Sequence, residues 1–248
     1  MQQLYPALRP CGVQDVYAEL ATLRSSPRVL MNVVTTIDGR ATIGGSSHAI
    51  GSATDHLLMQ KLRSVVDAVV VGAGTLRRES VSPGVAPPFR AERERAGLPP
   101  QPLTVVLGGE GELSLRGRIG RLGPERLVMF LPQGTDSLEV RDRATVHLYC
   151  GRRAEPEEVI RVLRERYGAR TVLLEGGPSV YGSFARAGLV DEVFWTLSPK
   201  LSGGGDAPGM LEGPGSEGGP RTLRLVSVYE HLGELYLRYR AAPTEVFD

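Results

Sequence analysis

The sequence predicts a single α/β domain with a mixed, mostly parallel central sheet, flanking helices and a C-terminal antiparallel hairpin. Along residues 28–197, short apolar runs alternate with amphipathic stretches, a pattern typical of strands joined by helices. Two last runs, 222–229 and 234–239, alternate apolar and polar side chains, which favours an antiparallel pair near the sheet edge. With no internal repeat or clean linker, we expect one domain over 28–248 and an N-terminal extension, 1–27, packed on it.

Length and composition are those of an ordinary globular protein. The chain has 248 residues, a formal net charge of +1 and 41% hydrophobic residues, so it can bury a sizeable core. The near-neutral charge gives no sign of a nucleic-acid partner. No apolar run approaches the roughly 18–20 residues of a membrane span, and the N-terminus lacks the apolar core of a signal peptide. We therefore expect a cytoplasmic protein with no membrane partner.

Cysteine and histidine usage argues against a metal site. Cys11 and Cys150 are the only cysteines and form no Cys-x-x-Cys pair. The four histidines, which show no ligand spacing, are His48, His56, His147 and His231. We expect no bound metal and two free thiols in a reducing compartment.

The N-terminal elements follow from apolar runs and turn residues. Residues 1–27 predict an irregular lead and a short helix, and the nearly continuous apolar run 28–34 predicts a strand covered on both faces. Within 35–43, Asp38 and Gly39 lie between β-branched residues, which predicts a hairpin turn.

A helix is predicted after the small, polar loop 44–51. Ser52 is a good N-cap for a helix over 53–66, and the charge of Asp55 suits the N-terminal end of the helix dipole. Arg63 falls on the last turn, where a cation suits the helix dipole. That role alone would explain the presence of an arginine there.

The middle of the chain alternates strands and loops. Residues 67–71 predict a buried strand that Gly72–Thr75 closes with a turn, and the polar segment 76–102 predicts a long surface loop of the type that often covers a site. Further strands are predicted at 103–107, 127–131 and 145–149, and a helix at 156–167 with Pro156 in its first turn.

The stretch 171–187 organises the site. A strand, 171–174, runs into Glu175 and two glycines, and a helix follows at once. Glycines let the backbone approach a ligand, and a helix N-terminus favours an anion. Glu175 would lie at the carboxyl end of its strand, where open α/β sheets bind ligands. A tight turn with a solvated glutamate is the alternative. A strand at 191–197 and a loop at 203–220 complete the pattern.

Two strand-to-glycine turns, Val71–Thr75 and Leu174–Ser179, would lie at the same end of a largely parallel sheet. Together they can hold a phosphate-bearing cofactor, although the first lacks the third glycine of the dinucleotide fingerprint. The chain has no Gly-x-Ser-x-Gly motif and no Walker lysine. Glycine turns with few polar side chains suit hydride transfer, for which a cofactor carries the chemistry.

These residues also resemble a known family. Over residues 28–240 the chain resembles the reductase domain of riboflavin biosynthesis, which has a dihydrofolate-reductase-like fold. Three runs carry the resemblance, in this order: V-V-T-T-I-D-G-R-A-T-I, L-R-S-V-V-D-A-V-V-V-G-A-G-T and V-L-L-E-G-G-P-S-V. The resemblance implies a homodimer that uses NADPH to convert 5-amino-6-(5-phosphoribosylamino)uracil, a small-molecule substrate, to its ribitylamino product. The zinc deaminase that is often fused to this domain has no matching motif here.

The resemblance also implies site residues. Ser47, Arg63 and Glu175 would bind the substrate, and Glu175 would be the catalytic residue. The implied cofactor-binding residues are Thr36, Asp38, Gly72, Gly74, Thr75, Glu79, Gly176, Gly177, Pro178, Ser179 and Val180.

Three departures from the family pattern leave alternatives open. Glu79 replaces an aspartate, Asn32 stands where lysine is frequent, and G-G-E-G follows Leu107 in place of residues suited to a 2′-phosphate. A divergent member that reduces another pyrimidine or a dihydropterin is therefore an alternative, and a non-catalytic nucleotide-binding module is a second. The pattern identifies no proton donor.

Overall fold

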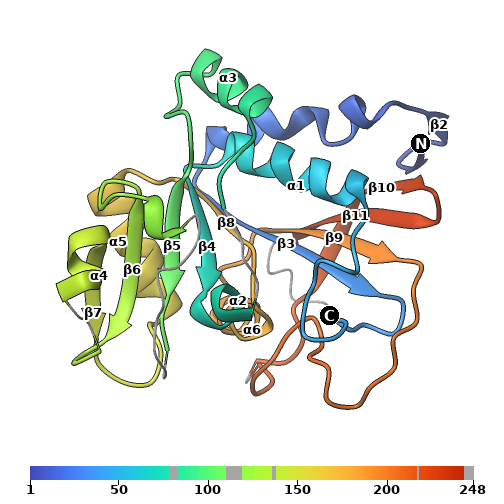
Figure 1. Ribbon diagram of the computed structural model, residues 1–248. Helices are drawn as coiled ribbons and strands as arrows, with labels where there is room; N and C mark the ends of the chain where they lie inside the picture. Colours follow the sequence, from blue (N-terminus) through green and yellow to red (C-terminus); the bar gives the residue numbers. More distant parts are fainter. Residues whose placement is uncertain (79–82, 110–118, 136–137, 217, 243–248) are drawn as a thin grey trace.

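The strands hydrogen-bond into one long sheet, which the computed structural model shows with helices on both faces (Figure 1). The structure describes residues 1–78, 83–109, 119–135, 138–216 and 218–242. Within them, eleven strands pair in the order β2-β1-β10-β11-β9-β3-β8-β4-β5-β6-β7. The strands from β9 to β7 run parallel to one another, and those from β2 to β9 are antiparallel. The predicted mixed, mostly parallel sheet is confirmed.

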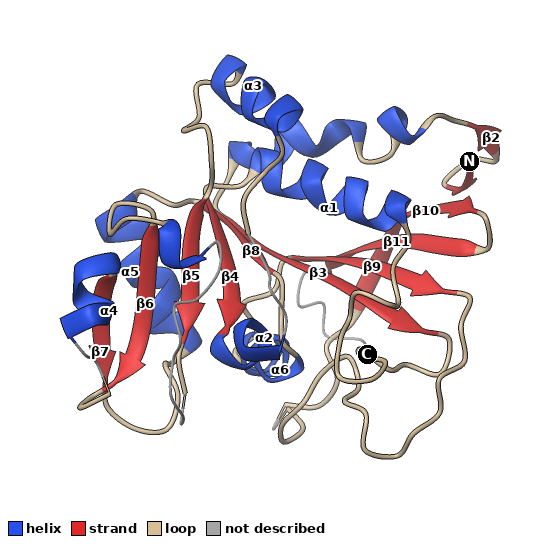
Figure 2. Cartoon of the chain, viewed as in Figure 1, coloured by secondary structure: helices blue, strands red, loops and turns tan. Residues whose placement is uncertain are grey.

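Figure 2 separates the strands from the helices by colour. The strands are β1 Gln2–Tyr5, β2 Arg9–Pro10, β3 Arg28–Thr36, β4 Ala68–Gly72, β5 Leu103–Leu107, β6 Leu127–Pro132, β7 Thr145–Tyr149, β8 Thr171–Leu174, β9 Glu192–Ser198, β10 Leu223–His231 and β11 Glu234–Ala241. The α-helices are α1 Ala53–Val65, α2 Ala73–Arg78, α3 Pro87–Arg95, α4 Leu138–Arg143, α5 Pro156–Tyr167 and α6 Pro178–Arg186, and the 3-10 helices are η1 Val13–Asp15, η2 Ala18–Ser25 and η3 Ile119–Arg121. The predicted strands from 28–34 to 234–239 all form, with ends that shift by a few residues.

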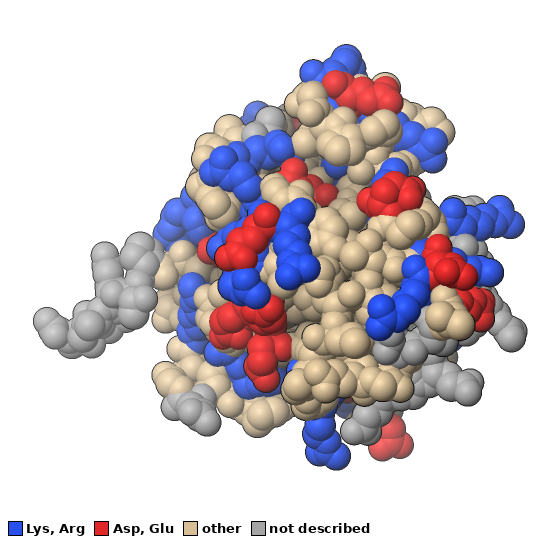
Figure 3. Space-filling model, turned by 90° about the vertical axis from the view of Figure 1, so that its left-hand side faces the viewer, with Lys and Arg blue, Asp and Glu red and all other residues tan. Residues whose placement is uncertain are grey.

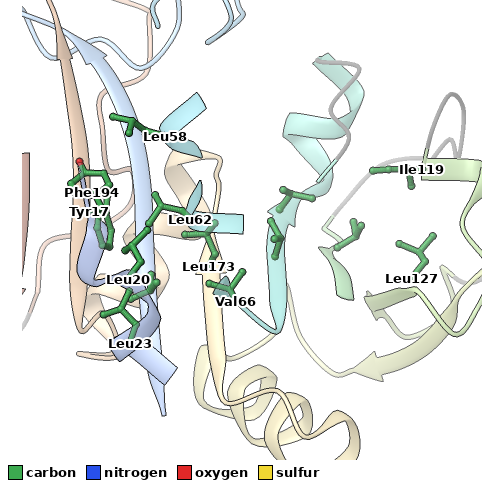
Figure 4. Packing of buried hydrophobic residues seen from close by; sticks show 14 of the residues in the cluster. Tyr17, Leu20, Leu23, Leu58, Leu62, Val66, Ile119, Leu127, Leu173 and Phe194 are labelled. Carbon is green, nitrogen blue, oxygen red and sulfur yellow. The ribbon is translucent and has the colours of Figure 1, made fainter. Parts of the chain in front are cut away.

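The sheet divides the core into two layers because successive strand residues point to opposite faces. In β3, Leu30 packs into the layer that α1 and η2 cover, whereas Val29 and Met31 pack into the layer that α5 and α6 cover. Figure 4 shows the first layer, where Leu62 and Leu20 lie against the sheet. A strand buried on both faces explains the nearly continuous apolar run of β3.

The ends of α1 and α5 follow their sequence signals. The Ser52 hydroxyl accepts hydrogen bonds from the Thr54 and Asp55 amides, at 3.2 and 3.3 Å, as predicted for an N-cap. Helix α5 has Pro156 in its first turn and ends at Gly168, whose φ of 64° suits glycine.

The predicted hairpin at 35–43 is a turn without a second strand. The Gly39 amide donates to the Thr36 carbonyl at 2.9 Å, so the Asp-Gly turn forms. Beyond it, Arg40 bridges to Gly209 instead of extending a ladder along β3. The prediction of a hairpin was wrong: β9 takes one edge of β3 up to Thr36, and the chain after the turn pairs with Gly209 in the loop after β9.

Three short helices replace predicted turns and loops. Residues 73–78 form α2 directly after β4, so Gly72–Thr75 is a strand-to-helix junction and not a free turn. The predicted loop 76–102 contains α3. Helix α4 was also missed. Each of the three has six to nine residues, too few turns for a clear apolar period.

The first 27 residues extend the sheet. Strand β1 pairs with β10, so the C-terminal hairpin has only the short β1 and β2 outside it among the described residues. The predicted short helix is the 3-10 helix η2. It and the residues before it bury Val16, Leu20 and Leu23.

Charges of both signs are interspersed on the face that carries β7 and α4 (Figure 3). In the described part of the chain, every helix is too short or too polar to cross a membrane.

Candidate active site

The two glycine junctions touch each other at the carboxyl ends of β4 and β8. These strands pair in parallel, and α2 and α6 start beside each other at their ends (Figure 1). The Gly72 amide donates to the Gly176 carbonyl at 2.7 Å. A Cβ on Gly72 would lie 3.1 Å from Val180 Cγ2, and one on Gly177 would lie 3.0 Å from Thr75 Oγ1. The contact therefore leaves little room for larger residues at Gly72 and Gly177.

The second junction is built for a ligand to approach the backbone. Gly176 has a φ of 109°, which only glycine adopts readily, and its peptide bond to Gly177 is cis. Gly177 is the N-cap residue of α6, and Pro178 occupies the first turn. The N-terminus of this nine-residue helix thus faces the junction with its positive dipole end.

A cavity opens on each side of these junctions. The Glu175 cleft has a volume of 420 Å³, and its walls include Asn32 of β3, Asp55, His56 and Arg63 of α1, Glu175 and Tyr181. The Ser179 pocket has a volume of 720 Å³, and its walls include Gly108 and Gly109 after β5, Arg77 of α2, Arg152 and Arg153 before α5, and Ser179. Both cavities lie at the carboxyl ends of the parallel strands, the place where open α/β sheets bind ligands.

Most of the predicted site residues lie in these two cavities. The Glu175 cleft contains Ser47, Arg63, Thr75, Glu175, Gly176, Gly177 and Pro178. The Ser179 pocket contains Gly72, Gly74, Ser179 and Val180. Glu79 lies outside the described residues. The glycine junctions and the substrate residues, which are far apart in sequence, are thus brought together.

Thr36 and Asp38 are the exceptions, because neither is among the described residues that line the two cavities. Thr36 is fully buried, and its hydroxyl accepts from the Arg40 amide at 2.9 Å. The Asp38 carboxylate accepts from the Ser202 and Gly203 amides at 3.2 and 2.8 Å. The Thr36 hydroxyl and these amides lower the pKa of Asp38 to about 2. The Thr36 hydroxyl thus closes the turn and the Asp38 carboxylate holds it against the loop after β9, while their role at a cofactor stays a prediction.

Arg63 and Glu175 form one bidentate unit. Arg63 Nε and Nη2 donate to the two Glu175 oxygens at 2.7 and 2.6 Å, and their side chains are 3% and 5% exposed. Arg63 Nη1 also donates to the Gly84 carbonyl at 2.9 Å. The prediction placed both in contact with substrate but did not pair them. A carboxylate has about four lone-pair sites, so Glu175 can accept further donors from the cleft while Arg63 fixes its orientation.

Asp55 is a wall residue that sequence reasoning placed only as a helix-dipole residue. Burial, together with the Glu234 and Glu175 charges, raises its pKa to about 6, although a hydrogen bond from Thr196 lowers it. Helical spacing could have identified it, because Asp55, Met59 and Arg63 recur every four residues and all line the cleft.

Two histidines were also missed. The His48 and His56 rings pack edge to face, with centroids 4.8 Å apart, in the Glu175 cleft. Burial, with the His48 and Arg63 charges, lowers the pKa of His56. No spacing marked this pair in the sequence.

The structure shows no metal site among the residues that it describes. Among the residues that the structure describes, no three His, Cys, Asp or Glu side chains are close enough to hold a metal ion. Cys11 and Cys150 are free thiols, half-buried and exposed respectively.

Comparisons with known proteins point to one protein family. The family described as RibD C-terminal domain matches residues 27–236. The riboflavin biosynthesis protein RibD of Mycobacterium tuberculosis is 33% identical over 180 residues, which are 72% of this chain and 44% of that protein. The 2,5-diamino-6-ribosylamino-4(3H)-pyrimidinone 5′-phosphate reductase of Archaeoglobus fulgidus is 28% identical over 200 residues, which are 75% of this chain and 87% of that protein. The chain thus spans less than half of the RibD relative and most of the archaeal one.

Solved structures share the fold. A pyrimidine reductase-like protein from Corynebacterium diphtheriae superimposes with a TM-score of 0.77 at 23% identity, over 93% of this chain and 98% of that one. RibD of Acinetobacter baumannii gives 0.72 at 22% identity, over 90% of this chain and 60% of that one.

Proposed function

The chain belongs to the RibD C-terminal domain family, and from this premise we propose that it is an NADPH-dependent pyrimidine reductase of riboflavin biosynthesis. Its substrate would be 5-amino-6-(5-phosphoribosylamino)uracil, whose ribosyl group it reduces to ribityl. The observation that carries the proposal is the contact between the two glycine junctions, with a cleft holding the Arg63–Glu175 pair on one side and an arginine-lined pocket on the other.

A second substrate has support from the comparisons. The archaeal relative, of which the chain covers 87%, bears the name of a reductase for the 2,5-diamino pyrimidinone, which has an amino group where the uracil has a carbonyl. Glu175 can accept hydrogen bonds from ring N–H groups of either compound. The 2,5-diamino compound is therefore the second candidate.

The residues of the two cavities fit a dinucleotide. A pyrophosphate would lie against the Gly72–Gly177 contact, where side chains are absent and the α6 N-terminus favours an anion. The nicotinamide, held in the Glu175 cleft, would supply the hydride. The adenosine half would extend into the Ser179 pocket.

The Ser179 pocket supports NADPH over NADH. Although the G-G-E-G segment after β5 has no group suited to a 2′-phosphate, Arg77, Arg152 and Arg153 reach the same pocket from α2 and from the loop after β7. Arginine binds phosphate through a planar fork of N–H donors. These arginines would donate to the 2′-phosphate in place of the group that is missing after β5.

The protein groups of the Glu175 cleft would position the sugar. Arg63 orients the Glu175 carboxylate, which would hold a ring N–H or ribose hydroxyl so that sugar C1′ lies near the hydride donor. Such positioning can supply much of the rate acceleration. A homodimer in the cytoplasm also belongs to the proposal, and light scattering of the purified protein tests the dimer.

The test measures absorbance at 340 nm with NADPH or NADH and three substrates: the uracil compound, the 2,5-diamino compound and a dihydropterin. We expect NADPH oxidation with a ribosylamino pyrimidine and a product heavier by two hydrogens. Turnover of dihydropterin alone would favour the divergent reductase. Cofactor fluorescence changes without oxidation of any substrate would favour a binding module.

The same assay tests cofactor choice. Replacing Arg152 and Arg153 together by Ala should raise KM for NADPH by roughly tenfold or more, because each charged hydrogen bond contributes about 1.5–3 kcal/mol, and should leave KM for NADH nearly unchanged. Arg161→Ala, on the exposed face of α5, is the matched control. Equal effects on both cofactors would contradict a 2′-phosphate role.

A further inference from the structure

Reduction of the sugar needs a proton as well as a hydride, and the Glu175 cleft contains a group placed to supply it. This inference rests on the proposed function. We propose that Asp55 is the proton donor: its carboxylic acid, held at the wall of the Glu175 cleft, protonates the nitrogen attached to sugar C1′ during reduction.

Asp55 is fixed in the cleft by the start of α1. It lies in the first turn, its amide donates to Ser52 Oγ at 3.3 Å, and it is 8% exposed. A Cβ on Gly51 would overlap the Asp55 carboxyl, so the glycine before the helix leaves room for it. Asp55 and Arg63 are two helical turns apart on one face, which places the carboxyl along the same wall as the Arg63–Glu175 pair.

The groups that face Asp55 come from several elements. Glu175 approaches from the end of β8, with Arg63 bound to both its oxygens. Glu234 of β11 is 5% exposed. Its Oε2 accepts from Ser52 Oγ and from the Tyr236 hydroxyl, each at 2.5 Å.

Two further groups complete this environment: Thr196 of β9, which hydrogen-bonds to Asp55, and the buried Tyr17, from the segment between η1 and η2. Burial and the two neighbouring carboxylates disfavour a third negative charge, and the pKa of Asp55 rises to about 6. Near neutral pH the residue exchanges its proton readily, as a general acid must.

Three other polar residues of the cleft are less suited to donate a proton. The Glu175 oxygens both accept from Arg63. The Tyr181 hydroxyl donates to the Asn32 carbonyl. The lowered pKa of His56 keeps its ring neutral near pH 7. Asp55 is the cleft residue whose surroundings favour a bound proton.

The chemistry balances with one proton. In the open-chain substrate, C1′ is doubly bonded to the nitrogen on the pyrimidine. A hydride from the reduced cofactor forms the new C–H bond at C1′, the π electrons move to the nitrogen, and the nitrogen takes the Asp55 proton. Asp55 is left as a carboxylate and regains a proton from solvent through the cleft, so each turnover consumes one proton and one reduced cofactor.

The test follows kcat from pH 5 to 9 in the wild type, Asp55→Asn and Asp55→Glu. The wild-type kcat should fall about tenfold per pH unit above roughly pH 6, as the acid loses its proton. Asp55→Asn should lower kcat by about 10²–10⁴-fold and abolish that limb, with KM and cofactor affinity changed less than about threefold. Asp55→Glu should keep a descending limb.

The matched control is Asp67→Asn. Asp67 accepts from the Thr171 amide at 2.8 Å and pairs with Arg24 beyond the other end of α1, away from the cleft, so this variant should keep the wild-type profile. Independently of turnover, ¹³C-aspartate NMR should show a carboxyl that titrates near pH 6 and is missing in Asp55→Asn.

Each outcome decides between the two proposals. If the wild type turns over and Asp55→Asn keeps its rate and pH profile, or if the Asp55 carboxyl titrates near pH 4, the donor role is wrong and the proposed function stands. If the wild type oxidises NADPH with no pyrimidine, the proposed function fails, and the donor role fails with it.

Discussion

Two buried arginine–glutamate groups differ in the number of arginines that bind the glutamate: one lies in the sheet, and the other joins α1 to the end of β8. The Glu192 cluster, centred on β9, contains Glu192 with three arginines among the described residues: Arg28 at 2.8 Å, Arg238 at 2.7 Å and Arg240 at 3.0 Å. Within the same part of the chain, the Arg63–Glu175 pair joins one arginine to one glutamate. Both glutamate side chains are almost completely buried, at 0% and 5% exposed.

The partners decide what each glutamate can do. In the Glu192 cluster, arginines of β3 and β11 take three of the roughly four acceptor sites and hold these strands to β9, whereas Arg63 takes two of those of Glu175. Arg238 also stacks 5.3 Å over the Phe194 ring. Glu175 keeps acceptor capacity and faces a cavity. Burial of a charge therefore does not mark a binding site by itself; unused hydrogen-bonding capacity beside a cavity does.

The largest effect is expected from a substitution that breaks the Glu192 cluster. Glu192→Gln leaves three arginines without their buried counter-charge, and we expect a loss of about 3–5 kcal/mol in the free energy of unfolding. Urea denaturation measures it. In the folded fraction, NADPH affinity should be unchanged. A loss below about 1 kcal/mol would show that the cluster is not structural.

The counterpart, Glu175→Gln, should act on turnover. Losing the carboxylate proposed to position the substrate should lower kcat about 10²–10³-fold, or about 3–4 kcal/mol, while the Kd of NADPH changes less than about threefold. The loss in unfolding free energy should be smaller than that of Glu192→Gln, because only Arg63 loses a partner and water reaches the cleft. Equal losses of turnover and of cofactor binding would contradict a substrate role.

The smallest expected effect is a change in the free energy of unfolding with pH, caused by Asp55 in the Glu175 cleft. Asp55 has its pKa raised to about 6 in the folded protein from 3.8, so its contribution to stability is complete below about pH 4 and is lost as the pH rises through 6. Urea denaturation between pH 4 and 7 should show the wild type losing about 2–3 kcal/mol relative to Asp55→Asn. A constant difference across that range would place the folded pKa near its ordinary value.

Elements with a strong local signal were predictable. Helix α5 carries a clear apolar period, Pro156 and Gly168, and β8 is a compact apolar run before two glycines. Sequence periodicity does not say which strands neighbour each other. The turn at Asp38 was therefore extended into a hairpin, whereas the chain after it pairs with Gly209, a residue far away in the sequence.

Some residues of the candidate site could be predicted from local sequence, and others could not. Gly72, Gly176 and Gly177 could be identified because a close backbone approach leaves glycine in the sequence. The pairing of Arg63 with Glu175 joins residues far apart in the chain, which no local pattern encodes. Asp55 gives a helix-start signal whether or not it faces a cavity.

The position of β3 has a consequence for synthesis of the protein. Its ladder partners, β8 and β9, come from the last third of the chain, after β4 to β7 have been made. While the ribosome is still making those segments, the apolar β3 has neither of its native neighbours, and β8 cannot yet bring the Glu175 side of the site beside Gly72. A nascent chain that stops before Thr171 therefore exposes an apolar strand and lacks one of the two glycine junctions of the proposed cofactor site. Holding chaperones should bind it, and a dinucleotide should not rescue it.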